Sequence, residues 1–397
     1  MKSGGEGGDG VEFISEKVKT LPAYLFSEFQ RKRKLLEDEG EDVIDLGIGA
    51  PDLSPPSFVI EELHYQSTIT VNHRYSTYGG SDTFKEAVAD FYHTYYDVDL
   101  DPETEILTLI GSKEGIANLV QAVINPGDKV LVPDPGYPVY NLAVSLAGGK
   151  SVSFSLNEDN EYIPDFIQLN ENIDKEVKMM FLNYPSNPTA ATVDLDTFKD
   201  AVAFAKKHKI LLAHDAAYNL ITFDRYNAPS ILQIPGAKEI AVEIGSLSKS
   251  FNMTGWRIGY AVGNREVIEA LATLKSNIDT SQFLPIQKAA ARALKSDLQT
   301  VKENNNIYRE RMEVLHNGLI SQGFDVKKPR GTIFLWMKVP SKFTSKSFAD
   351  FVLEKAAVIV TPGIAFGKNG EGYVRIAVTV RKGRIEEVLD RFQKMKF

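Results

Sequence analysis

The segment Ser246-Leu247-Ser248-Lys249, with Arg257 eight residues further on, combines residue types that could do chemistry together. Two serine hydroxyls and a guanidinium can hold a phosphate group through several hydrogen bonds. Burial and a neighbouring positive charge lower the pKa of a lysine and make its amine nucleophilic. The segment therefore predicts an amine that meets an aldehyde beside a phosphate site.

Polar residues also follow four other predicted strands, at the point where each strand ends. The five strands are predicted at 105–110, 129–132, 177–182, 210–213 and 240–244. Because ligands bind beyond the carboxyl ends of strands in open α/β sheets, we expect these residues to share one edge. They are Gly111-Ser112-Lys113, Pro133 to Tyr137, Asn183 to Pro188, and His214 to Tyr218.

This set of residues matches the needs of pyridoxal 5′-phosphate (PLP). Ser112 opens a predicted helix, whose free N–H groups favour an anion, and Ser246, Ser248 and Arg257 add donors for the phosphate. Tyr137 offers a face for a flat ring. A buried Asp215 needs a cation, which a protonated pyridine nitrogen supplies. Lys249 then meets the aldehyde.

At these residues the sequence resembles the class I/II, fold type I aminotransferases, from about residue 20 to the C-terminus. The most specific match is SLSKSFNMTGWRI, residues 246–258. The other matching motifs are residues 46–52, 75–80, 183–189, 215–218 and Arg375. The resemblance implies an enzyme that moves an amino group from an L-amino acid to a 2-oxo acid. The implied fold is α/β, a mostly parallel seven-stranded-type sheet sandwiched by helices, with a smaller α+β domain.

The resemblance also implies roles for single residues. Lys249 forms the Schiff base with PLP and transfers the proton, and Asp215 holds the pyridine nitrogen. Tyr218 and Asn187 donate to the ring oxygen, and Tyr137 stacks on the ring. The implied phosphate ligands are Ser112, Lys113, Ser246, Ser248, Arg257 and a Tyr75 from the partner of a homodimer. Arg375, Gly49, Asn187 and Tyr24 are the implied substrate contacts.

Within the family the chain is most similar to the LL-diaminopimelate aminotransferase-like branch. Residues 21–26, the pair Ser112-Lys113 and residues 366–375 carry this likeness. Some members of the branch use methionine-like, aromatic or alanine-type substrates instead. There is no arginine between Arg265 and Arg292, where aspartate aminotransferases place one. Asp279 stands where an acidic side chain would suit an amine-bearing substrate.

The elements around these motifs predict two lobes. The chain has 397 residues, more than the roughly 250–300 at which one core stops growing. We expect a disordered tail at 1–15, a small domain from 16–60 and 290–397, and a large PLP-binding domain at 61–289. In the last part, a helix is predicted at 300–324, strands at 332–338, 357–361 and 372–379, and a helix at 383–395.

The composition of the chain excludes several classes of binding partner. The net charge of −8 repels nucleic acid and anionic membranes, and no apolar run reaches the roughly 18 residues of a membrane span. The absence of cysteine excludes thiolate chemistry and is compatible with a cytoplasmic location. No histidine pair has zinc-binding spacing, so no metal site is expected.

Three other functions fit parts of the sequence. Ser246 to Lys249 also reads as Ser-x-x-Lys, the motif of serine acyl enzymes, although the companion motifs of those enzymes have no full match. Gly47-Ile48-Gly49 lacks the third glycine of a dinucleotide site. A PLP-dependent C–S β-lyase on the same fold is the nearest alternative, because it needs the same cofactor residues.

Overall fold

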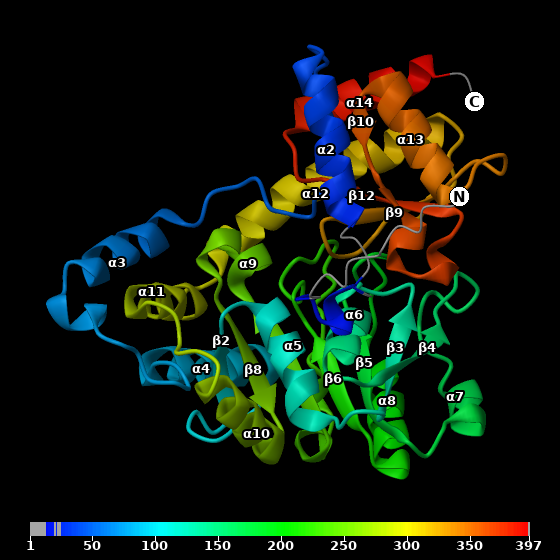
Figure 1. The fold of residues 1–397 in the computed structure, drawn as a ribbon. Coiled ribbons are helices and arrows are strands. Elements are labelled where there is room, and N and C mark those ends of the chain that lie inside the picture. The colour runs from blue at the N-terminus through cyan, green and yellow to red at the C-terminus, as the bar shows by residue number, and fades with distance from the viewer. Residues whose placement is uncertain (1–12, 20, 22–24, 396–397) are drawn as a thin grey trace, which may run out of the picture.

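The structure is a computed structural model that describes residues 13–19, 21 and 25–395. Most of the predicted tail, and Tyr24, lie outside the described residues. A seven-stranded sheet forms the centre of the larger part of the molecule (Figure 1). Its order is β2 (Ile106–Leu109), β8 (Gly259–Gly263), β7 (Ala241–Ser246), β6 (Leu211–Asp215), β5 (Val177–Asn183), β3 (Lys129–Asp134) and β4 (Lys150–Ser155).

Strand β8 runs in the opposite direction to the other six strands of this sheet. The expected mostly parallel α/β sheet is therefore confirmed, and the five predicted strands are all present. The sequence analysis missed β4 and β8. Both lie in the sheet as it is observed, β4 at one edge and β8 between β2 and β7.

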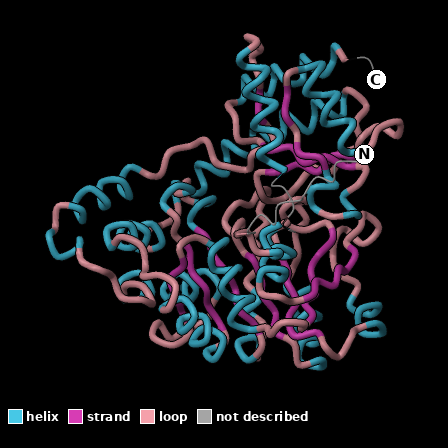
Figure 2. Tube along the Cα trace, in the orientation of Figure 1, coloured by secondary structure: helices cyan, strands magenta, loops and turns pink. Residues whose placement is uncertain are grey.

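Helices cover both faces of the sheet, as the tube in Figure 2 also shows. One face buries the apolar stripe of α5 (Ser112–Val123), where Ile116, Leu119 and Val120 pack on strand residues, together with α6 (Val139–Leu146) and α10 (Arg265–Ser276). Each fully buried side chain of this kind contributes about 1.5–3 kcal/mol to folding. The other face carries α4 (Asp82–Tyr96) and α8 (Leu195–His208), and α7 (Phe166–Asn172) packs on α8. These helix layers fix the positions of the strand ends.

A second hydrophobic core joins both ends of the chain. Strand β1 (Ile44–Asp45) pairs in parallel with β10 (Val358–Ile359), and a three-stranded sheet has the order β11 (Thr361–Pro362), β12 (Tyr373–Ala377), β9 (Phe334–Lys338). Around them lie α2 (Leu25–Asp38), α12 (Gln299–Ser321), α13 (Ser345–Ala356) and α14 (Lys382–Lys394) (Figure 1). The remaining described helices are α1 (Glu16–Lys19), α3 (Ser57–Ser67), α9 (Leu247–Ser250), α11 (Leu284–Leu294) and six short 3-10 turns.

The predicted domain boundaries fall inside helices. Residue 60 lies within α3 (Ser57–Ser67) and residue 290 within α11 (Leu284–Leu294). These two helices pack against each other, and α11 also packs against α4 (Figure 1). The division into two lobes stays a proposal, and we propose that its boundaries lie outside these two helices. No helix among the described residues is both long and apolar enough to cross a membrane.

Candidate active site

Lys249 lies in the short helix α9, which begins where β7 ends. Ser246 caps this helix, because its hydroxyl accepts a hydrogen bond from the backbone N–H of Ser248 at 3.2 Å. The amine of Lys249 donates to the carbonyl oxygen of Gly49 at 2.7 Å. Burial, followed by the positive charges of Arg375 and Arg257, lowers the pKa of Lys249 to about 8. A minor but substantial part of the amine is therefore in the neutral, nucleophilic form at physiological pH, where an ordinary lysine is almost wholly protonated.

Asp215 ends the neighbouring strand β6 and is buried. Its carboxylate accepts hydrogen bonds from the Tyr140 hydroxyl at 2.8 Å and the Ala217 N–H at 3.2 Å. Burial raises the pKa of Asp215, and these donors, with the charges of His214 and Lys249, oppose that rise. The site thus contains a buried anion opposite the Lys249 amine, and that anion can hold a cationic ring nitrogen.

Tyr140 is a functional candidate that the sequence analysis missed. The rings of Tyr137 and Tyr140 meet edge to face at 5.8 Å, and Tyr140 stacks on Phe181 at 4.6 Å. Tyr137, which was predicted, therefore borders the residue that binds Asp215. The two tyrosines stand three residues apart, Tyr137 just before α6 and Tyr140 in its first turn, and this spacing is the signal that could have revealed the pair.

Arg375 lies on β12 and is buried. Its guanidinium donates to the side-chain oxygen of Asn187 at 2.7 Å and to the carbonyl oxygen of Gly47 at 2.6 Å. It also lies over the rings of Phe334 and Phe366, at 4.2 Å and 4.8 Å from their centroids. These contacts fix the guanidinium in one orientation, which suits bidentate binding of a carboxylate. The two phenylalanines were not predicted.

Asn187 and Tyr218 lie beside these groups. The Asn183 side chain donates to the Asp215 carbonyl oxygen and accepts from the Asn187 N–H, both at 2.8 Å. This bridge fixes the loop of Asn187 against the end of β6. The Tyr218 ring meets Phe334 edge-on at 5.4 Å, and burial raises the pKa of its hydroxyl although Arg375 opposes the shift. Tyr218 is therefore a neutral hydrogen-bond donor.

Three glycines leave room for these contacts. A Cβ on Gly49 would overlap the Phe334 ring, so only glycine lets its carbonyl reach Lys249. Gly111 has φ +77°, and a Cβ there would overlap the Arg257 guanidinium. Gly259 pairs with Ser246, and a Cβ on it would lie 3.2 Å from the Ser112 nitrogen. Arg257, Ser246 and the start of α5 are thus brought together, as a phosphate site requires.

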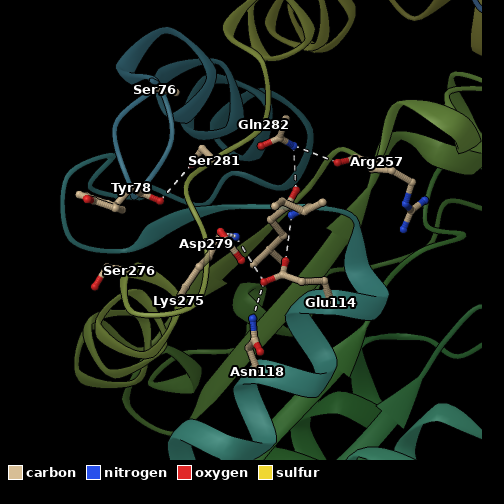
Figure 3. Close-up of polar contacts among 12 residues, drawn as sticks. Ser76, Tyr78, Glu114, Asn118, Arg257, Lys275, Ser276, Asp279, Ser281 and Gln282 are labelled. Atoms are coloured by element: carbon tan, nitrogen blue, oxygen red, sulfur yellow. Dashed lines mark hydrogen bonds and ion pairs between the residues drawn. The ribbon is translucent and has the colours of Figure 1, made fainter. Parts of the chain in front are cut away.

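Figure 3 shows a layer of polar contacts that supports this phosphate site. Lys275 is fully buried and forms ion pairs with Glu114 at 3.3 Å and with Asp279 at 2.6 Å. Glu114 accepts from the Ile110 N–H at 2.9 Å. The Gln282 amide donates to the carbonyl oxygens of Leu109, at 3.0 Å, and Arg257, at 2.9 Å. The Asp279 carboxylate is therefore engaged within the chain, and its contact with a substrate amine stays a prediction.

The remaining predicted residues are placed less directly. Ser248 is buried in α9, while Lys113 is exposed at the start of α5. Tyr75 is 92% exposed, and the backbone oxygen of the nearby Tyr78 accepts from the Ser281 hydroxyl at 3.0 Å. The Tyr75 ring is thus available to another chain and is not enclosed in the site of its own chain. Tyr24 lies outside the described residues.

The charges of the site fit PLP. Lys249, Arg257 and Arg375 act on one another electrostatically, and Asp215 is the buried carboxylate among them. Positive charge in this excess calls for anions, and a phosphate at Arg257 and a carboxylate at Arg375 meet that need. The sheet, the lysine after β7 and the aspartate at the end of β6 define a PLP-dependent enzyme of fold type I.

Comparison with known proteins names the family. Residues 41–392 match the family model of the class I and II aminotransferases, so the chain belongs to that family and is a PLP-dependent aminotransferase. It is 46% identical over 381 residues to an LL-diaminopimelate aminotransferase of Moorella thermoacetica, covering 96% of this chain and 98% of the relative. An Aquifex aeolicus enzyme of the same name is 43% identical over 383 residues, covering 96% and 99%.

Solved structures agree with this assignment. A substrate-bound BacF structure from Bacillus subtilis is 38% identical, has a TM-score of 0.92 and covers 98% of this chain and 99% of its own. A mutant aspartate aminotransferase of Thermus thermophilus is 27% identical with a TM-score of 0.91, covering 97% and 100%. Since proteins of different names share this fold so closely, the fold alone does not select the amino donor.

Proposed function

We propose that this aminotransferase takes the amino group of LL-diaminopimelate, or of a closely similar diamino acid, and transfers it to a 2-oxo acid. The names of the curated relatives, 46% and 43% identical over nearly full length, support this substrate. The lack of an arginine between Arg265 and Arg292 also fits, because the family's usual ligand for a short dicarboxylate is missing there.

One observation carries the assignment of roles. The Lys249 amine lies between a buried carboxylate, Asp215, and two arginines, and its pKa is lowered to about 8. PLP, when bound, supplies the electron sink that stabilises negative charge on the α-carbon of an amino acid. Lys249 is the nearby group that can accept the α-proton of the amino acid at its Nζ. In the second half of the reaction it can give a proton back to the α-carbon derived from the 2-oxo acid.

The other residues bind and orient. Arg375, fixed by Asn187, Gly47 and two rings, binds the α-carboxylate of the substrate. Asp215 holds the cationic ring nitrogen, and Asn187 and Tyr218 donate to the ring oxygen. Tyr137 covers the ring. The phosphate is bound by the start of α5 with Ser112 and Lys113, and by Ser246, Ser248 and Arg257; Gly49 and Tyr24 border the substrate.

We also propose a homodimer with shared active sites. Tyr75 is exposed, as are Val71 and Tyr78 of the same segment and Phe283, whose ring contacts that of His73. Exposed aromatic and aliphatic side chains grouped in this way mark a protein interface. In the dimer Tyr75 would reach the phosphate of the partner subunit. The absence of cysteine fits a cytoplasmic location, which we propose as well.

A half-reaction screen tests the substrate. The holoenzyme is mixed with one amino acid at a time, and the loss of the visible absorbance of the bound cofactor is followed. We expect LL-diaminopimelate to react at least about 100-fold faster than methionine, phenylalanine, alanine or aspartate, a difference of about 2.7 kcal/mol. A chain that reacts with methionine or phenylalanine and leaves LL-diaminopimelate untouched would contradict the proposal.

The same preparation separates transamination from β-elimination. It is given a cysteine-type thioether amino acid without any 2-oxo acid, and free pyruvate and ammonia are measured. We expect neither product to accumulate, because an aminotransferase stops after one turnover when no oxo acid is present. Continuous release of pyruvate would identify the C–S β-lyase alternative instead.

A further inference from the structure

A fully buried acid and base lie directly behind Asp215. His214 precedes Asp215 on β6. Glu243 on β7 is the register partner of His214. Neither side chain has any exposed surface. The roles assigned above do not use this pair, and two ionisable groups without solvent are costly unless their hydrogen bonds are complete.

The contacts of the imidazole ring account for both of its nitrogens. Nε2 lies 3.0 Å from the carbonyl oxygen of Tyr184, which can only accept, so Nε2 carries a hydrogen. Nδ1 lies 2.8 Å from Oε2 of Glu243. One proton is shared along this second contact, and its position decides whether the pair is neutral or ionic.

The surroundings of Glu243 place that proton on the nitrogen. Oε2 also accepts from the Ile231 N–H at 3.0 Å. Oε1 accepts from the Tyr92 hydroxyl at 2.5 Å and the Ser230 hydroxyl at 2.9 Å. Several donors on one carboxylate stabilise its ionised form. Burial opposes ionisation, but hydrogen bonds from His214, Tyr92 and Ile231 prevail and lower the pKa of Glu243.

The other groups packed around the pair are uncharged or favour a cation. Burial, with the Glu243 charge, raises the pKa of Tyr92, Tyr96 and Tyr260, so these hydroxyls stay protonated. The ring of Phe198 meets the imidazole edge-on at 4.8 Å. Asp215, the next residue along β6, is the other carboxylate that acts on this histidine. A positive charge on His214 is therefore paired with Glu243 and also acts on Asp215.

We propose that His214 is an imidazolium, ion-paired with Glu243, and that its charge keeps Asp215 ionised toward the cofactor nitrogen. Charges then alternate from Glu243 through His214 and Asp215 to that nitrogen. His214 is a positioning residue, since it acts through Asp215, and its bond to Tyr184 also anchors the loop that carries Asn187. The inference rests on the proposed role of Asp215 but not on the identity of the amino donor.

Nitrogen NMR on the wild-type holoenzyme tests the charge state. The six histidines are labelled with ¹⁵N, and the His214 signals are assigned by their loss in His214→Asn. We expect both ring nitrogens of His214 to carry hydrogen at pH 7, because Nε2 faces a carbonyl oxygen and Nδ1 faces the Glu243 carboxylate. An Nδ1 without a hydrogen at pH 7 would overturn the proposal, whatever substrate the enzyme uses.

A pair of variants tests the effect on Asp215. Glu243→Gln keeps the shape and removes the charge, while Tyr92→Phe removes a neutral donor from the same carboxylate. We expect the dissociation constant of PLP, titrated into the cofactor-free protein, to rise about 10-fold in Glu243→Gln, or about 1.4 kcal/mol. In Tyr92→Phe it should change by less than about 2-fold. Equal changes in the two variants would mean that packing, not charge, links Glu243 to the cofactor.

Discussion

At the residue scale, the lowered pKa of Lys249 has a direct consequence for its reactivity. A lysine whose pKa is lowered gains its neutral form at lower pH, so its nucleophilicity rises through about pH 8. We predict that an amine-reactive reagent modifies Lys249 of the cofactor-free protein with a midpoint near pH 8. Peptide mapping of samples taken across the pH range measures that midpoint.

The control for this titration removes one of the positive charges that lower the pKa of Lys249. Arg375→Gln takes away a positive charge that lowers the pKa of Lys249, so the midpoint should move to higher pH. A wild-type midpoint near 10.4, the ordinary value for lysine, would show that the amine is not perturbed.

Arg375 gives a second prediction at this scale. Lysine keeps the charge but loses the planar pair of donors, so Arg375→Lys cannot bind a carboxylate through two parallel hydrogen bonds. We expect KM for the amino donor to rise about 10–100-fold, the equivalent of 1.4–2.8 kcal/mol, with a smaller change in kcat. Steady-state kinetics with the best donor of the screen measure both constants. A loss confined to kcat would contradict the assigned binding role.

The sequence predicted the charged residues of the site better than its aromatic ones. Lys249, Asp215, Arg257 and Arg375 stand in motifs whose chemistry is legible from residue type and spacing, and the structure brings them together. Tyr140, Phe334 and Phe366 were missed because an aromatic residue on a helix or strand reads as core. Their contacts with Asp215 and Arg375 depend on tertiary packing that no local pattern encodes.

At the element scale, the two missed strands have physical reasons. Strand β4 reads Lys-Ser-Val-Ser-Phe-Ser, and only Phe154 is buried, so it lacks the apolar run of the inner strands. Strand β8 begins and ends with glycine, which weakens a strand signal. Inner strands such as β5 and β7 were found because nearly all of their residues are buried and most of them are apolar.

The buried Lys275 predicts how the elements around the phosphate site depend on one another. Lys275→Met leaves Glu114 and Asp279 without their common cation, which should lower the free energy of unfolding by ~2–3 kcal/mol. Because Glu114 braces the turn before α5 and Gln282 holds Arg257, the dissociation constant of PLP should rise about 10-fold, or 1.4 kcal/mol. Denaturant unfolding and PLP titration measure the two effects.

A surface ion pair provides the matched control. Lys199 pairs with Asp196 at 2.6 Å, but both side chains are largely exposed, so Lys199→Met should change neither quantity measurably. If Lys275→Met destabilised the fold while PLP affinity stayed unchanged, the support for the phosphate site would be refuted.

At the scale of the whole molecule, the proposed dimer predicts complementation between two inactive variants. Lys249→Ala removes the reactive amine, and Tyr75→Ala removes the residue assigned to the partner's site. If Tyr75 acts across the interface, a mixed dimer has one site with both residues intact. We expect activity to reappear, up to one quarter of the wild-type value, when the two are unfolded together and refolded.

Light scattering on each variant and on the mixture checks that all are dimers. Mixtures that remain as inactive as the single variants would show that Tyr75 serves the site of its own chain. A monomer with full activity would remove the interface altogether.

The pairing of β1 with β10 has a consequence for when the enzyme first becomes active. Gly47 and Gly49 follow β1, and their carbonyl oxygens hold Arg375 and Lys249. Both glycines are fixed by residues made more than 300 positions later, since the Thr379 hydroxyl donates to the carbonyl oxygen of Ile48 between them and the Ala377 N–H donates to that of Leu46 before them. A nascent chain on the ribosome can therefore complete its central sheet long before the substrate-binding arginine has been synthesised. Catalysis begins only once translation has passed β12 and the first strand has found its distant neighbour.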